Sequence, residues 1–138
     1  MNAYRTYQQN STPACNRIDL LLALFDGAIE RLESAADELR RTNPYPALSL
    51  MAKAQLIVAE LASGVNPEAG EISVNLLRLY EFVSYCISTR QPDQLDASVR
   101  VLRTLKQGFD AIRDEAVELE RNGAIPAVDV NHFVHVTA

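Results

Sequence analysis

The chain has 138 residues, which suits one domain, and 48% of them are hydrophobic, enough to bury an ordinary core. Its formal net charge of −5 argues against nucleic acid as the main partner, because DNA- and RNA-binding domains usually carry a basic face. Its longest apolar run has six residues, Leu20 to Phe25, far short of the ~20 that a membrane-spanning helix needs, so no membrane insertion is expected.

Residues 1–15 are polar and lack helical periodicity, so we interpret them as an extended or loosely ordered N-terminal arm that contains Tyr4 and Tyr7. This polar start does not have the apolar segment of a signal peptide. Cys15 and Cys86 have no metal-type or redox spacing. Together these features favour free thiols and a cytoplasmic protein.

A first helix is predicted to begin near Asn16, whose side chain can accept a backbone N–H, and Asp19 suits its first turn. Its buried face is expected to comprise Ile18, Leu21, Leu22, Phe25, Ala28, Ile29, Leu32, Ala36 and Leu39, at spacings of three and four. Leu20 and Leu24 fall outside this face. Prolines at 44 and 46 are expected to end the helix, because proline cannot continue its hydrogen bonds.

A second helix is predicted from Pro46 or Ala47 to Ser63, with Gly64 as a left-handed stop. A third is predicted to begin between 68 and 72 and to run to about Thr89. The expected buried stripe of the second helix is Ala47, Leu50, Met51, Ala54, Ile57, Val58 and Leu61, and that of the third is Ile72, Leu76, Leu79, Val83 and Cys86.

The fourth helix has the most regular pattern. Two series repeat every seven residues: Leu95, Leu102, Phe109 and Ala116, and Leu105, Ile112 and Leu119. Such seven-residue repeats predict a continuous helix that packs along a left-handed seam and ends at 122–123. The tail, 124–138, is either a short fifth helix or disordered. The predicted fold is therefore all-α: an antiparallel four-helix bundle over 16–123, an arm at 1–15 and the tail.

The second and third helices carry more apolar residues than one buried face needs. Off the stripes lie Leu48, Leu56, Val74, Leu77, Phe82 and Tyr85. A bundle helix normally has one dry and one wet face, so these residues predict an outer apolar groove suited to helix-in-groove recognition. Two alternatives stay open: a homodimer face, or scattered exposed residues without a function.

The side chains that do chemistry are sparse. The two histidines, His132 and His135, lie in the tail, and no Glu-x-x-His pair, Gly-rich phosphate loop or nucleophile elbow occurs. Cys86 lies on an apolar stripe, which favours a packed thiol over a nucleophile. We therefore expect no metal site, no cofactor and no enzyme activity.

Several segments carry a family resemblance. They are the Tyr-x-x-Tyr of Tyr4 and Tyr7, “LLALFDGAIERL” at 21–32, “KAQLIVAEL” at 53–61 and “NPEAGEISVNLLRLYEFV” at 66–83. In this order and spacing, over about residues 1–115, they resemble the flagellin-specific export chaperones of the FliS family. Within the first segment, Gly27 is expected to allow a close helix approach, since a mid-helix glycine costs ~1 kcal/mol relative to alanine.

The resemblance implies a cytoplasmic bundle that binds the disordered C-terminal segment of flagellin, prevents premature polymerisation and delivers flagellin to the flagellar export machinery, without catalysis or nucleotide. It also implies that the arm can compete for the binding surface. The candidate contacts are Leu48, Leu56, Ile57, Val74, Leu77, Phe82 and Tyr85, with Gln55, Asn75 and Tyr80 added by motif match. For Gln55 and Asn75 the alternative is bonding between helices, and for Tyr80 it is packing with a satisfied hydroxyl.

Overall fold

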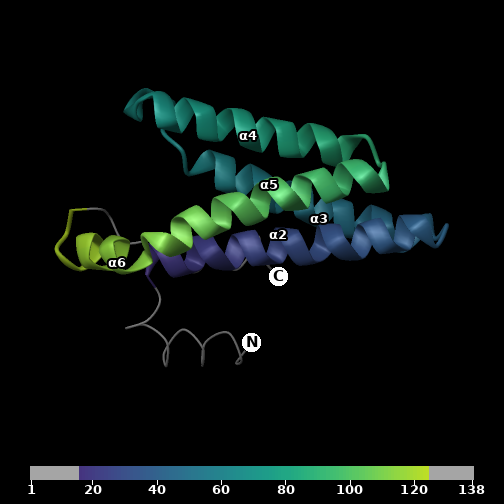
Figure 1. Cartoon of the computed structure of the whole chain (residues 1–138), viewed down its shortest axis with the longest axis horizontal. Helices are drawn as coiled ribbons and strands as arrows, with labels where there is room; N and C mark the ends of the chain where they lie inside the picture. Colours follow the sequence, from purple (N-terminus) through teal and green to yellow (C-terminus); the bar gives the residue numbers. More distant parts are fainter. Residues whose placement is uncertain (1–15, 125–138) are drawn as a thin grey trace.

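The computed structural model describes residues 16–124, which are helical apart from their turns (Figure 1). The elements are α2 (Arg17–Arg40), α3 (Pro44–Ser63), the 3-10 helix η1 (Pro67–Ala69), α4 (Glu71–Ser88), α5 (Pro92–Ala111) and α6 (Arg113–Arg121). No strand occurs in this part of the chain, so the predicted all-α class is confirmed. The expectations for Tyr4, Tyr7, Cys15, His132 and His135 lie outside the described residues.

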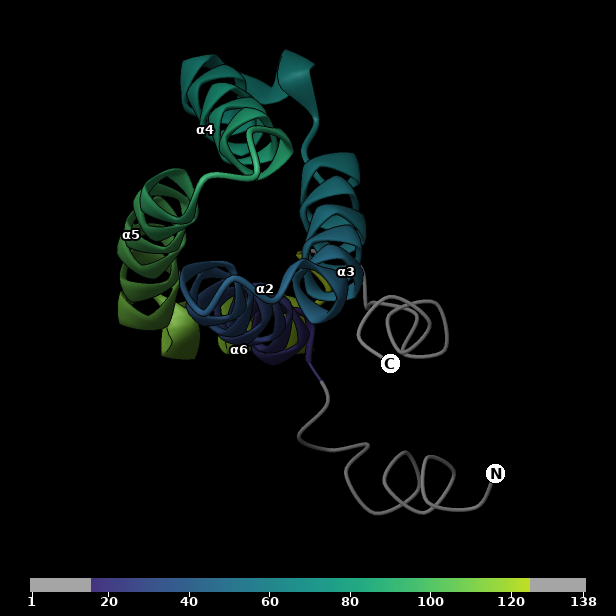
Figure 2. The ribbon, with the colours of Figure 1, turned by 90° about the vertical axis from the view of Figure 1, so that its right-hand side faces the viewer.

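The four long helices enclose a common core, as the end-on view of Figure 2 shows. α2 packs against α3 and α5, and α4 closes the ring by packing against the other sides of the same two helices. α2 and α4 therefore lie diagonally across the bundle. Short turns join successive helices, which gives the antiparallel arrangement that the sequence predicts.

The helix ends follow local chemistry. Asn16 caps α2, because its Oδ1 accepts the Asp19 N–H at 3.0 Å. α3 begins at Pro44, slightly earlier than predicted, because proline is tolerated in a first turn. The left-handed conformation expected at Gly64 is wrong: its φ is −82°, and backbone bonds from Gly64 to Leu61 and from Val65 to Ala62 tighten the turn instead.

α2 is the most deeply buried helix. Leu20 and Leu24, expected to lie off its buried face, are both buried, so that prediction is wrong. The reason is that α3 and α5 both pack on α2, which makes its buried arc wider than a single stripe. Gly27 faces α3: a Cβ there would lie 3.2 Å from Arg31 Nη1 and 3.4 Å from Ile57 Cδ1, so it would meet the ends of side chains rather than the backbone of α3.

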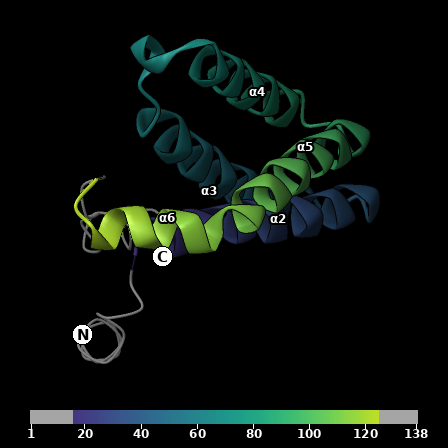
Figure 3. The same cartoon turned by 60° about the vertical axis from the view of Figure 1, so that its left-hand side comes forward.

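α4 departs from its prediction in its N-terminal half, residues 71–79. Ile72 is 85% exposed and Leu79 is also exposed, although both were expected in the core. The buried residues of α4 are Tyr80, Val83, Cys86 and Ile87, all in its C-terminal half. Figures 1 and 3 give the reason, because α4 and α5 diverge with distance from the turn that joins them.

The predicted fourth helix is divided at Ile112, where φ is −105° and ψ is 12°. Its first seven-residue series enters the core, with Leu95 and Leu102 buried and Phe109 partly buried. In the second series Ile112 and Leu119 are exposed, so the prediction of one continuous packed seam is wrong there. Figure 3 shows α5 crossing α2 obliquely before α6 turns along α2.

Candidate functional site

Exposed apolar side chains gather on α4 and the neighbouring face of α3. On α4, Tyr85 is 65% exposed, Phe82 is exposed, and Val74 and Leu77 are partly exposed. On α3, Leu56 is 63% exposed and Leu48 is also exposed. Apolar residues gathered in this way commonly mark sites where a protein binds another polypeptide.

A hollow of about 280 Å³ lies between α3 and α4. Gln55 and Ser84 bond across it: Gln55 Nε2 donates to the Ser84 carbonyl and Ser84 Oγ donates to Gln55 Oε1, each at 2.9 Å. Its remaining lining residues are Val58, Ala59, Ala62, Leu77, Tyr80 and Glu81. Because Ala59 lies one turn after Leu56, the hollow adjoins the exposed apolar face of α3.

A second depression, the α4/α5 groove, has a volume of about 340 Å³ and almost wholly apolar walls. Its lining residues are Ile72, Asn75, Leu76, Leu79, Thr104, Leu105, Gly108, Phe109 and Ile112. Beyond Leu79 and Leu105 it continues into a smaller hollow lined by Arg100 and Val101. The groove therefore follows α4 on the side away from α3.

A third cavity, of about 290 Å³, lies at the end of the bundle, where α4 begins. Leu21, Leu61 and Val65 are among its lining residues, so it lies between α2, α3 and α4. It shares Tyr80 with the α3/α4 hollow, and it shares Leu76 and Phe109 with the α4/α5 groove. The N-terminal half of α4 thus has empty space on several sides, and its side chains lose the contacts that a close-packed core supplies.

The C-terminal half of α4 is held more firmly. Ser98 Oγ on α5 lies 3.4 Å from the Val83 carbonyl and shares its hydrogen with the Gln94 carbonyl at 3.2 Å. Cys86 Sγ lies 3.3 Å from Gln94 Oε1 in a hydrogen bond. Cys86 is buried and forms no disulfide, which confirms the predicted packed thiol. α4 is therefore anchored at one end and loosely packed at the other.

The structure separates the predicted contact residues into groups. Leu48, Leu56, Asn75, Phe82 and Tyr85 are exposed, and Val74 and Leu77 are partly exposed. Gln55 bonds between helices, as its alternative interpretation held.

Ile57 and Tyr80 are buried, which agrees with the expected core stripe for Ile57 and with the packing alternative for Tyr80. Both face the crowded contact with α2, where the Tyr80 ring lies 6.4 Å from that of Phe25 and the Phe25 ring lies 5.6 Å from that of Phe109. Burial raises the pKa of the Tyr80 hydroxyl well above its ordinary value. Tyr80 is therefore a neutral core residue.

Sequence reasoning missed the α4/α5 groove, because it assigned Ile72, Leu79 and Ile112 to packed seams. One signal was available: apolar residues occur on every side of α4, so packing on two neighbours leaves some of them uncovered. Which ones stay uncovered depends on the angle between α4 and α5, and periodicity carries no information about that angle.

The seam between α2 and the α5–α6 segment is polar by contrast. Asp19, Asp26, Glu33 and Arg40 recur every seven residues along α2 and form ion pairs with Arg113, Lys106, Arg103 and Asp96. Arg40 also pairs with Asp93 at 3.0 Å. We call these contacts the ion-pair ladder. It lies across the bundle from the exposed side of α4.

Other kinds of site receive no support in residues 16–124. No group of three or more histidine, cysteine or acidic side chains there is placed to hold a metal ion. Nor does any helix in that range combine the length and apolar character needed to cross a membrane.

An all-helical bundle with apolar grooves on both sides of one helix is typical of a module that binds other polypeptides. The family model described as “Flagellar protein FliS” matches residues 1–116 of the chain. Because the match covers most of the sequence, the chain belongs to the FliS family, which supports a general role as a flagellar export chaperone. No curated protein sequence matches the chain.

Proposed function

We propose that this protein binds the disordered C-terminal segment of flagellin in the cytoplasm, keeps flagellin from polymerising early and delivers it to the flagellar export machinery. Family membership supports the general role. The observation that carries the specific proposal is the apolar surface around α4, bounded by the α3/α4 hollow and the α4/α5 groove. On this proposal the contacts include Leu48, Leu56, Val74, Leu77, Asn75, Phe82 and Tyr85.

Hydrophobic burial is the expected driving force. A disordered client that folds on binding loses roughly 2–5 kcal/mol or more in ordering. Burial of apolar surface contributes about 25 cal/mol per Å², so a client that covers on the order of 1,000 Å² can exceed that cost. A long segment that wraps α4 meets this requirement better than a short peptide confined to one groove.

Co-purification with flagellin tests the proposal. Full-length flagellin is expected to co-elute with the chain, and flagellin that lacks its C-terminal segment is expected not to. The matched control removes an equal length from a different, exposed part of flagellin and should leave binding intact. Equal capture of the C-terminally truncated protein would contradict the proposal.

The second candidate is a homodimer or a different helical adaptor that uses the same apolar surface, which the exposure of Leu56 and Tyr85 also favours. Light scattering on the chain alone separates the two. A concentration-independent monomer is expected if flagellin is the occupant, whereas a stable dimer that excludes flagellin favours the alternative.

The N-terminal arm is a proposed competitor for the same surface. If Tyr4 and Tyr7 cover it in the absence of a client, removing residues 1–12 should raise the affinity for flagellin. Replacing Tyr4 and Tyr7 by serine in the full chain is the matched variant and should have the same sign. Unchanged affinity in both variants would rule out competition by the arm.

A further inference from the structure

The bend between α5 and α6 has no local cause in the sequence. The segment from Gly108 to Glu115 contains no proline, and Gly108 lies within α5, a full turn before the bend. At the bend the Ile112 N–H donates to the Phe109 carbonyl, three residues back, at 3.2 Å. Regular helical bonding resumes with Ala116 to Ile112 at 2.9 Å. Sharp helix bends usually arise at proline, at glycine or where tertiary contacts intrude, so we attribute this one to contacts with α2.

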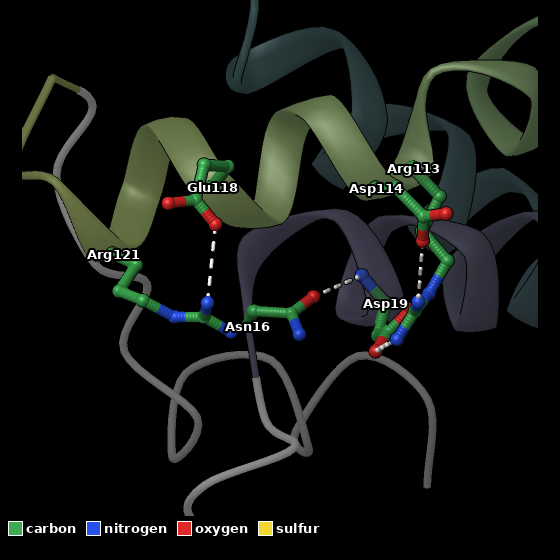
Figure 4. Close-up of polar contacts among 6 residues, drawn as sticks. All are labelled: Asn16, Asp19, Arg113, Asp114, Glu118 and Arg121. Carbon is green, nitrogen blue, oxygen red and sulfur yellow. Dashed lines mark hydrogen bonds and ion pairs between the residues drawn. The ribbon is translucent and has the colours of Figure 1, made fainter.

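Two polar contacts hold α6 on the first turn of α2. The Arg113 guanidinium binds both Asp19 carboxylate oxygens, Nε to Oδ1 at 2.6 Å and Nη2 to Oδ2 at 2.8 Å. Glu120 Oε2 accepts the Arg17 backbone N–H at 2.6 Å, where the helix dipole of α2 favours a negative charge. Figure 4 shows Arg113 reaching Asp19 beside the Asn16 cap of α2. No residue of α6 is buried, so hydrophobic packing adds little to this docking.

These contacts are strong in geometry but modest in free energy. The Asp19 and Arg113 side chains are 29% and 40% exposed, and ion pairs with such access to water contribute little. The interruption of the helix at Ile112 opposes these contacts, because the sequence of α5 and α6 has the pattern of one continuous helix. The Asp19–Arg113 pair is therefore placed to hold the bent arrangement against the straight one.

We propose that the α5–α6 joint is a conformational switch: closed, it bends and docks α6 on α2 through Asp19 and Arg113, and open, it forms one helix that leaves α2. Leu105 and Ile112 already line the α4/α5 groove. Leu119 follows Ile112 by seven residues, so straightening brings it into line with them and lengthens the apolar wall by about two turns. That consequence for binding rests on the proposed function, whereas the switch itself does not.

A distance measurement in the chain alone tests the switch. Nitroxide labels are attached at Ser63→Cys, on the last turn of α3, and Asn122→Cys, after α6, in a Cys15→Ser background with the buried Cys86 retained. Double electron–electron resonance should give one main distance for this parent protein. Arg113→Gln should raise the ratio of a second, displaced population by about fivefold, the effect expected for loss of one partly exposed ion pair.

The matched control is Lys106→Gln, which removes the neighbouring ion pair of the ladder, to Asp26, and leaves the joint untouched. It should keep the parent distribution. The charge exchange Asp19→Arg with Arg113→Asp should restore the main distance. A distribution for Arg113→Gln that matches the parent, or an equal shift in Lys106→Gln, would overturn the proposal.

High salt gives an independent measurement on the unsubstituted joint. At 1 M NaCl the Debye length falls to about 3 Å, so the exposed ion pair weakens and the displaced population should grow. An unchanged distribution at high salt would also count against the switch. Because no client is present in these experiments, their failure is distinguishable from a failure of flagellin binding.

Discussion

The seam between α2 and the α5–α6 segment and the two seams around α4 solve the same packing problem differently. The first carries the ion-pair ladder and a polar cleft of about 440 Å³ beside Glu33 and Lys106, above a core that contains Phe25 and Leu32. The two seams around α4 are apolar, have few hydrogen bonds across them and contain the α3/α4 hollow and the α4/α5 groove. One small bundle can therefore combine a firm side, around α2 and its dense core, with a loose side, around α4, whose apolar surface is available for binding.

Charge order explains part of this difference. Along α2 the ladder reads acidic, acidic, acidic and basic, and its partners carry the opposite signs in antiparallel order. A shift of α5 along α2 would oppose like charges at the Arg40 end or leave charges unpaired. The ladder therefore specifies the register of α5 more than it adds free energy, since exposed pairs contribute about 0–1 kcal/mol each. No such device fixes the N-terminal half of α4.

The largest effect is expected on the firm side. Phe25→Ala removes a fully buried ring from between those of Tyr80 and Phe109 and should lower the free energy of unfolding by about 3–5 kcal/mol. Urea unfolding followed by circular dichroism measures it. Ile72→Ala, on the loose side, is the control and should change stability by no more than about 0.5 kcal/mol. Similar losses in both variants would remove the distinction between the two sides.

Phe82→Asp should weaken flagellin binding by at least tenfold and leave the helical content unchanged, because it places a charge on an exposed apolar site. Isothermal titration calorimetry with a flagellin C-terminal peptide measures the affinity. Ser34→Asp adds the same charge on an exposed position of α2 and should bind normally. A folded Phe82→Asp protein with full affinity would exclude this part of α4 from the contact.

Gln55→Ala removes both hydrogen bonds to Ser84 and should lower the free energy of unfolding by about 1 kcal/mol. In the parent protein, hydrogen exchange should be faster at residues 71–79 than at 83–87. In the variant, exchange should rise around Ser84, where the two hydrogen bonds are lost. The exposed Gln107→Ala should leave both measurements unchanged. Uniform exchange along α4 would mean that its two ends are equally well packed.

The smallest effect is expected on the dependence of folding stability on pH. The hydrogen bond from Arg113 lowers the pKa of Asp19 below its ordinary value of 3.8, despite the opposing effect of burial. The ion pair therefore stabilises the fold above about pH 4, and that contribution is lost as pH falls through the lower folded-state pKa. Asp19→Asn should lower stability by less than about 1 kcal/mol at pH 7, and the difference from the parent should vanish once the pH lies below the lowered folded-state pKa of Asp19. A constant difference across this range would assign the effect to something other than ionisation.

Much of the fold was readable in the sequence because helix periodicity and turn residues are local. The Asn16 cap followed from its side-chain chemistry, the end of α3 at Ser63 from the glycine that follows it, and the core positions Leu95 and Leu102 from their spacing. For the candidate site the sequence showed the excess of apolar residues on α3 and α4, and Leu56, Phe82 and Tyr85 are exposed as expected. Ile57 and Tyr80 were each given both a core and a contact interpretation, and only the packing of α3 and α4 against α2 shows that both are buried.

The remaining features depend on how the helices meet. The sequence by itself determined that there are helices, where they end, that their faces suit an antiparallel bundle, and that more apolar surface exists than the core can hold. Only the tertiary structure decided which apolar residues stay outside, because the divergence of α4 from α5 opens a groove at Ile72 and Leu79. It also decided the bend at Ile112, because Asp19 and Glu120 act across about a hundred residues of sequence, beyond the reach of any local pattern.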